Sequence, residues 1–233
     1  VLTALALAAI LLTVSVRVIA PKLPPLVGRA DVQETRNFAH ANANALRLAS
    51  TDGMVIITPT SGSSITGNAV IRAFRRGDTT EDQLREYVAG LVQMREEQGA
   101  LVIQTEPGPR PAEYDLFVQY EINVPEGTDL EVTSNNGNVW IRPGCGNVKV
   151  DGRNSDIDIA KPLGSVHAES VNGRIQLAEA PAGGTLRTVN GDVYAEVAGG
   201  KLNAATDNGV IHAKLLGSGI EEAVLTSQNG GVN

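Results

Sequence analysis

The stretch VNGRIQLAEAPAGGTLRTVNGD, residues 171–192, contains the pairs Asn172-Gly173 and Asn190-Gly191, and the 18-residue spacing between these two pairs is the strongest indication of the fold. An asparagine recurs at the same spacing on both sides of this stretch, with one Asn-Ser in place of Asn-Gly and a slightly longer final step. The asparagines of this series are Asn136, Asn154, Asn172, Asn190, Asn208 and Asn229. A fixed period of this size indicates a stacked structural repeat.

Apolar residues flank each of these asparagines at constant offsets. Around Asn172 they are Val166 and Ala168 on one side, and Ile175 and Leu177 on the other. Apolar residues at every second position are typical of a half-buried strand. Asn and Gly tolerate the positive φ of a tight turn. Each repeat is therefore expected to be a short strand, an Asn-Gly turn and a second short strand.

Stacking of such repeats explains the composition of the chain. Equivalent residues on neighbouring coils would lie ~4.8 Å apart, and columns of Val, Ile, Leu and Ala would fill a narrow core. An aromatic content of only 3% suits that interior. The sequence predicts an all-β fold, a single-stranded β-helix (β-solenoid) with ~18 residues per coil, whose regular coils are residues 128–233. A sandwich or a barrel is the alternative, and we expect the chain to be a fragment of a longer solenoid.

The N-terminal part divides into three segments. Residues 1–20 begin with the uncharged run VLTALALAAILLTVSV, which predicts a transmembrane anchor, with a signal segment as the alternative. Residues 21–45 look like a linker, because they contain Pro24-Pro25 and the run AHANANA. Residues 46–127 are predicted to hold the first coil, further strands and one inserted helix, since LRLASTDGMVII already matches the repeat.

The inserted helix is expected over residues 80–98. Leu84, Val88, Leu91 and Val92 form an apolar stripe at helical spacing. Thr80 and Gln83 have the spacing of a capping box at the helix start. Such a helix would cap the open end of the solenoid or, alternatively, bind a partner.

The chain resembles the bacterial "putative adhesin" family, a domain of unknown function. The resemblance rests on ALRLASTDGMVII, EINVPEGTDLEVTSNNGNVWI, VNGRIQL, VNGDVYAEV and DNGVIHAKL, and it extends from about residue 46 onward. It implies a right-handed single-stranded β-helix on a membrane-anchored or exported protein at the cell surface or envelope. It carries no catalytic motif.

One outward column is the candidate binding site. Four residues after each asparagine stand Trp140, Asp158, Gln176, Tyr194 and His212. Aromatic side chains on an exposed face can stack on sugar rings or anchor a protein partner. The alternative is that Trp140 packs near the start of the solenoid.

The sequence gives little indication of a nucleic-acid-binding, metal-binding or catalytic site. A net charge of −7 argues against nucleic-acid binding. Asp156 and Asp192 are separated by Arg174 in their column, which suggests neutralised charge rather than a metal cage. We expect no metal, no cofactor and no catalytic residue. Cys145 is the single cysteine, so no internal disulfide forms.

These observations lead to one functional expectation and two alternatives. We expect a non-enzymatic protein, anchored in the membrane through residues 1–20, whose extracytoplasmic solenoid binds an unidentified protein or glycan at the cell envelope. One alternative is a membrane-anchored sensor or regulator of envelope stress. The other is a β-helical enzyme that acts on polysaccharides, which would require at least three carboxylates on one face.

Overall fold

The computed structural model describes residues 30–41, 43–106 and 114–233. The anchor or signal segment predicted for residues 1–20 lies outside this part. The described chain is mostly β-structure with one short helix. None of its described helical structure has the length and apolarity needed to cross a membrane.

The elements follow one another in a regular order. Those of the N-terminal part are β1 (Val32–Ala41), β2 (Ala45–Thr60), β3 (Ser64–Arg75), α1 (Glu81–Leu91), β4 (Val92–Glu97), β5 (Ala100–Thr105) and β6 (Tyr114–Pro125). Those of the C-terminal part are β7 (Asp129–Asn136), β8 (Val139–Ile141), β9 (Val148–Asn154), β10 (Ile157–Ala160), β11 (Val166–Asn172), β12 (Ile175–Ala180), β13 (Gly183–Asn190), β14 (Val193–Asn208) and β15 (Ile211–Asn229).

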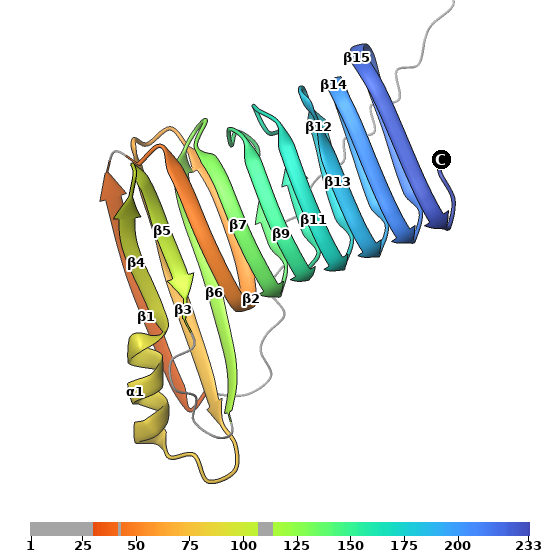
Figure 1. The fold of residues 1–233 in the computed structure, drawn as a ribbon. Coiled ribbons are helices and arrows are strands. Elements are labelled where there is room, and N and C mark those ends of the chain that lie inside the picture. Colours follow the sequence, from red (N-terminus) through yellow and green to blue (C-terminus); the bar gives the residue numbers. More distant parts are fainter. Residues whose placement is uncertain (1–29, 42, 107–113) are drawn as a thin grey trace, which may run out of the picture.

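Two rows of parallel strands run along the molecule. The first row contains β7, β9, β11 and β13, and continues through the second halves of β14 and β15 (Figure 1). The second row contains β8, β10 and β12, and continues through the first halves of β14 and β15. In both rows a residue pairs with its equivalent in the next repeat, as in Val148 with Val166 and Ile157 with Ile175. A unit is therefore a first-row strand, the asparagine turn and a second-row strand.

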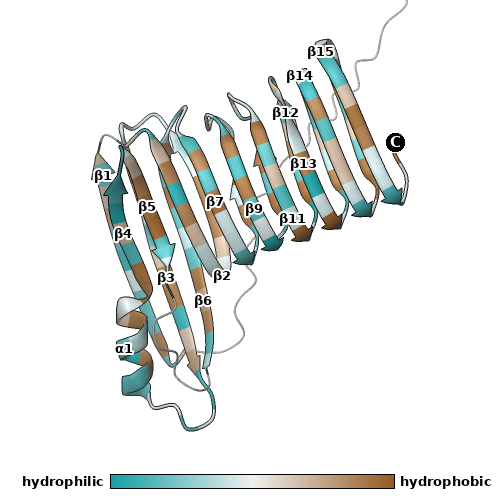
Figure 2. Cartoon of the chain, in the orientation of Figure 1, coloured by the Kyte–Doolittle hydropathy of each residue, from teal (hydrophilic) through white to brown (hydrophobic). Residues whose placement is uncertain are grey.

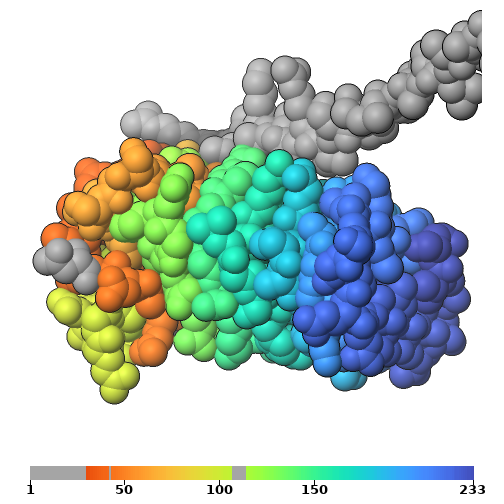
Figure 3. Space-filling model, turned by 90° about the horizontal axis from the view of Figure 1, so that it is seen from above, coloured from red at the N-terminus to blue at the C-terminus, as the bar shows by residue number. Residues whose placement is uncertain are grey.

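The order of the units in space follows the sequence. In Figure 3 the colours follow one another along the long axis, from the N-terminal elements to β15. The register between β14 and β15 shifts partway along the pair, because Val193 pairs with Ile211 whereas Asn208 pairs with Asn229. This shift accounts for the longer final step of the asparagine series.

Strand β2 supplies the first complete unit, as its sequence predicts. Leu46 pairs with Leu130 and Asp52 with Asn136 in the first row, and Val55 pairs with Val139 in the second. On its other edge, β2 pairs in parallel with β5 and β6. Strands β5 and β6, which come between β2 and β7 in the sequence, thus lie on the far side of β2.

Antiparallel strands and the helix complete this N-terminal end. Strand β3 pairs with β6, β1 pairs with β3, and β4 pairs with β5, all antiparallel. Helix α1 packs beside β1 and β3 at the same end (Figure 1). It buries Leu84, Tyr87, Val88 and Leu91, and its capping box between Thr80 and Gln83 is present. Three of the four residues of the predicted stripe are therefore in the helix, whereas the fourth, Val92, begins β4.

Two predicted boundaries at this end are wrong. The helix ends at Leu91 rather than at residue 98, because residues 92–97 form β4, and Gln98 and Gly99 with positive φ close a hairpin to β5. The predicted linker of residues 21–45 contains β1, whose residues alternate in burial and pair with β3 over their whole length. Pairing with a partner distant in sequence, rather than local propensity, makes this segment a strand.

The glycine of the asparagine turn is required by close stacking more than by its φ. A Cβ on Gly191 would lie 2.2 Å from the carbonyl oxygen of Gly173, and one on Gly209 would lie 2.1 Å from that of Gly191. The non-glycine residues of positive φ in the described part are Gln98, Lys161 and Glu179, so the turn asparagines do not adopt this conformation. Where the Asn-Gly turn contains a positive φ, at Gly137 and Gly173, it is the glycine that adopts it.

The interior contains apolar columns and one column of hydroxyls. Apolar and polar residues alternate along the strands (Figure 2), and most of the apolar ones are buried, although Leu215, Leu216 and Val224 of β15 are exposed. Two positions before the asparagine, the side chain is a buried hydroxyl in most units. Thr188 Oγ1 donates to the carbonyl oxygen of Gly173 and Thr206 Oγ1 to that of Gly191, both at 2.9 Å. These bonds satisfy turn carbonyls that face the interior.

Candidate functional site

The candidate column of the second row divides into a buried half and an exposed half. The strand register places its members side by side in the predicted order, from Trp140 to His212. Trp140 is only 8% exposed. Its indole Nε1 donates a 2.9 Å hydrogen bond to Oδ2 of Asp158. Of the two alternatives for Trp140, the burial supports the packed one: its side chain lies in the column between Ile56 of β2 and Asp158, at the start of the solenoid.

Asp158, next to Trp140 in the column, is partly buried. Burial raises the pKa of its carboxyl group, while the nearby Arg174 guanidinium acts in the opposite direction. The Arg174 Nη2 atom lies 3.5 Å from Oδ1 of Asp158. Asp158 therefore holds both an indole N–H and a guanidinium, which gives it a structural role in the column.

The exposed half of the column is an aromatic pair. The rings of Tyr194 and His212 stack with their centroids 4.8 Å apart and an interplanar angle of 11°. Tyr194 is 36% exposed. Stacking on neighbouring strands holds both rings in place, so that they offer a flat edge to a ligand with little loss of side-chain entropy.

A groove adjoins the aromatic pair. It has a volume of about 410 Å³, within the range of small-ligand sites. Its polar lining comes from Gln176, Tyr194, Glu196, His212, Lys214 and Asn233. The Lys214 Nζ atom lies 3.2 Å from Oε1 of Glu196, so that the groove holds one cation and one carboxylate beside two aromatic rings.

Two other carboxylates, directly before second-row strands, accept hydrogen bonds from backbone N–H groups. Asp156 Oδ1 accepts a 2.9 Å hydrogen bond from the backbone N–H of Arg174, and Asp192 Oδ1 accepts one of 2.8 Å from that of Val210. Both acceptors lie one unit before their donors. The predicted column of neutralised charges is thus a column of caps for backbone N–H groups.

The six turn asparagines form a continuous side-chain ladder. Each of the five asparagines after Asn136 donates its Nδ2 group to Oδ1 of the asparagine one unit earlier, at distances from 2.7 to 3.0 Å. The series begins at Asp52, whose Oδ1 accepts a 2.8 Å bond from Asn136. Because the amides inside the ladder both donate and accept, a hydrogen-bonded amide column runs along one edge of the stack.

The outer face of the first row carries a second groove. It has a volume of about 610 Å³ and includes Glu131, Lys149 and His167 in its lining. Lys149 lies between two carboxylates, with its Nζ 3.1 Å from Oε1 of Glu131 and 3.2 Å from Oδ2 of Asp151. Hydrogen bonds to these carboxylates raise the pKa of Lys149.

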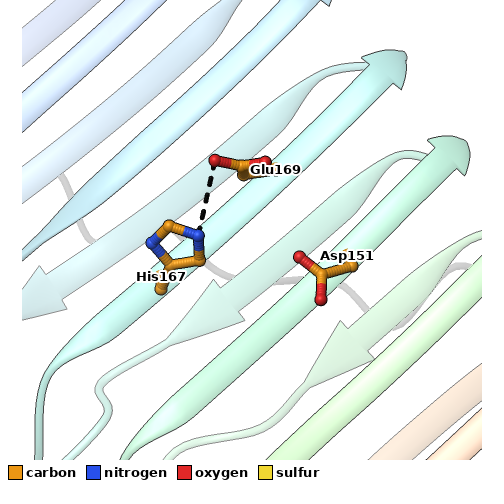
Figure 4. Close-up of side chains that lie close together, drawn as sticks. All are labelled: Asp151, His167 and Glu169. Atoms are coloured by element: carbon orange, nitrogen blue, oxygen red, sulfur yellow. Dashed lines mark ion pairs between the residues drawn. The ribbon is translucent and has the colours of Figure 1, made fainter.

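Asp151, His167 and Glu169 gather next to this groove (Figure 4). One donor atom from each lies within 4.8 Å of the others, and His167 Nε2 is 3.4 Å from Oε1 of Glu169. From the sequence we expected no metal site, and this cluster was not among the candidate sites. The sequence does contain a signal for this cluster. Asp151 and Glu169 occupy the same position in successive repeats, and His167 stands two positions before Glu169, so that all three side chains are expected on one face.

The remaining histidine lies elsewhere. His40 is on β1, and its Nε2 is 3.4 Å from Oε2 of Glu96 on β4. Its predicted place in a linker is wrong for the reason given for β1. The three histidines of the chain therefore occupy separate surroundings.

Comparison with known proteins gives likenesses in structure only. No family model matches the chain, and no curated protein matches its sequence. A solved structure described as a putative adhesin from Bacteroides fragilis is 14% identical, covers 87% of this chain and 97% of its own, and has a TM-score of 0.49. A putative adhesin from Parabacteroides distasonis is 12% identical, with coverage of 86% and 96% and a TM-score of 0.42. A putative cell adhesion protein from Clostridium sporogenes is 8% identical, with coverage of 87% and 98% and a TM-score of 0.37.

Proposed function

We propose that this chain is a non-enzymatic β-solenoid that displays a binding surface at the cell envelope, in the manner of an adhesin, for a glycan or protein ligand. The solenoid is right-handed, with one coil for each unit. In-register parallel pairing of equivalent residues in both rows supports this architecture. The apolar residues 1–20 motivate the envelope location and the membrane anchor.

The stacked pair of Tyr194 and His212 beside the groove is the observation that carries the proposal. A partly exposed tyrosine whose ring is fixed by a neighbour is well suited to contact the apolar face of a sugar ring or a protein side chain. Glu196 and Lys214 add a carboxylate and an ammonium group that can bind hydroxyl, amide or charged groups of the ligand.

Binding rather than catalysis is the role proposed for this surface. Asp156 and Asp192 each accept a backbone N–H from the next unit, and Asp158 accepts the indole N–H of Trp140. These hydrogen bonds give Asp156, Asp158 and Asp192 a structural role in the stack. Display of a rigid surface requires no moving part and no cofactor.

Binding of the full chain to purified cell-wall polysaccharide and to an array of glycans tests the proposal. Tyr194→Ala and His212→Ala should each weaken binding by about tenfold, the effect of losing an aromatic anchor worth roughly 1–2 kcal/mol. Leu163→Ala is the matched control, because Leu163 is 60% exposed and lies outside the aromatic pair. Equal binding by all variants, or none to any probe, would overturn the proposal for glycans.

A protein ligand is tested with the same variants. The full chain is used to pull down partners from an envelope extract, and each captured protein is then titrated in purified form. A partner whose affinity falls with Tyr194→Ala and stays constant with Leu163→Ala supports the proposal. A partner whose affinity is indifferent to both aromatic changes binds another surface.

A further inference from the structure

We propose that Asp151, His167 and Glu169 bind a divalent transition-metal ion, Zn²⁺ in particular, on the outer face of the first row. The three side chains come from two neighbouring strands. His167 and Glu169 are two positions apart on β11 and so point to the same face, and Asp151 on β9 is the register partner of Glu169. Figure 4 shows the three side chains on this face.

The spacing of the donor atoms suits a small cation. Donors at 2.0–2.2 Å from a tetrahedral Zn²⁺ lie about 3.3–3.6 Å apart. His167 Nε2 and Glu169 Oε1 already have this separation, at 3.4 Å. All three donors lie within 4.8 Å of one another, so that small rotations of half-exposed side chains bring Asp151 to the same distance.

The donor set selects the kind of metal. One imidazole and two carboxylates suit Zn²⁺, whereas Ca²⁺ prefers six to eight oxygen ligands and Mg²⁺ an octahedron of oxygens. Three protein ligands leave one position of a tetrahedral ion free. Because His167 also lines the 610 Å³ groove, a group bound in that groove can reach the free position.

The Lys149 ammonium group competes with the metal ion for the carboxylate of Asp151. Its Nζ atom lies 3.2 Å from Oδ2 of Asp151 and has a second carboxylate, that of Glu131, at 3.1 Å. When a metal takes Asp151, Lys149 keeps its pair with Glu131. Loss of the Lys149 ammonium should therefore favour metal binding, because the competition for Asp151 is removed.

Calorimetric titration of the full, tag-free chain with ZnCl₂ tests the site. The wild-type chain should bind one Zn²⁺, and His167→Ala and Glu169→Gln should each lower the affinity by at least about tenfold, since changes beyond the ligand shell alone cost about ten- to a hundredfold. Lys149→Met should raise the affinity by about two- to fivefold, because it removes an exposed ion pair with a ligand.

His40→Ala and His212→Ala are the matched controls, because each removes another histidine of the chain and leaves the cluster intact. Both should bind Zn²⁺ with wild-type affinity. Absence of Zn²⁺ binding would overturn the proposal, as would an affinity that is unchanged in His167→Ala or that falls only in a control. Glycan or protein binding at Tyr194 does not enter this test, so the two proposals stand or fall separately.

Discussion

The Cβ of Ser155 lies 3.0 Å from the position that a Cβ on Gly152 would occupy. In most units, a serine or threonine stands two positions before the turn asparagine, and a glycine stands directly after it. Around Asn154 these two residue types are exchanged: Gly152 stands two positions before it, and Ser155 stands directly after it. The hydrogen bonds are rearranged accordingly. Ser155 Oγ donates to the Ser134 backbone carbonyl at 3.1 Å, and Ser134 Oγ donates to the Gly137 carbonyl at 3.1 Å.

This exchange predicts a pair of compensating mutations. Gly152→Ser should destabilise the chain by about 1–3 kcal/mol through overpacking against Ser155. Ser155→Gly should cost about 1–2 kcal/mol, because a buried hydroxyl and its hydrogen bonds are lost. The double mutant restores the pattern of the other units and should lie within about 0.5 kcal/mol of wild type, which makes the coupling strongly non-additive.

Urea unfolding monitored by fluorescence measures the effect, since Trp140 is the single tryptophan and lies buried one unit away. Thr185→Ser on the outer face of β13 is a control for a general effect of serine. If the two single mutations add in the double mutant, Gly152 and Ser155 do not exchange roles as described.

The register of the stack could be predicted from the asparagine series, and so could the match of β2 to the later units. Asp52 and Asn136 are 84 residues apart and still pair as the repeat requires. The hydroxyl column recurs just as regularly, with Ser134, Ser170 and Thr188 at one offset. An alignment of the apolar residues alone does not include this hydroxyl column. Serine and threonine are exposed more often than buried, so they are not counted as core residues when the sequence is read.

Other features depend on which segments meet in space, and no local pattern encodes that. Strands β5 and β6 lie on the far edge of β2, which the repeat does not specify. The alternation of residues along the strand predicts that the Trp140 side chain lies on the outer face of its strand. It does not predict whether neighbouring side chains cover the indole there. Asp151 and His167 belong to successive repeats and meet only because two strands are stacked.

A second prediction concerns Arg36, which holds the C-terminal end of helix α1. The last turn of this helix has no basic residue of its own. Arg36 reaches it from β1 and donates to the carbonyl oxygens of Val88 at 3.2 Å and Val92 at 3.0 Å, and also to that of Ala89. A cation at this position satisfies free carbonyls and complements the helix dipole.

Arg36→Met should lower the stability of this end of the molecule by about 2 kcal/mol, because charged hydrogen bonds are lost and carbonyls are left without a donor. Hydrogen exchange should accelerate in α1 and the adjoining part of β1 and stay constant in β9 to β13. Arg85→Met is the control, since its exposed pair with Glu81 is worth no more than about 0.5 kcal/mol. Equal protection of α1 in wild type and Arg36→Met would show that the helix is held by its apolar face alone.

Cys145 predicts how stability depends on pH in the alkaline range. Its side chain is fully buried, and burial raises the pKa of the thiol to about 12. In the unfolded chain the thiol titrates near pH 8.5. Between these values the unfolded state has lost a proton that the folded state keeps, so stability is complete below about pH 8.5 and falls as pH rises toward 12.

The loss attributable to Cys145 should reach about 1–1.5 kcal/mol by pH 9.5. Cys145→Ala should have a lower stability at pH 7, because a small cavity remains, and a flatter profile from pH 8 to 9.5. Tyr120, whose pKa burial also raises to about 12, contributes only above about pH 10, which keeps this window specific to the thiol. A thiol reagent should accordingly modify Cys145 in urea and leave the folded chain unmodified at pH 8, whereas rapid modification of the folded chain would show that the thiol is accessible.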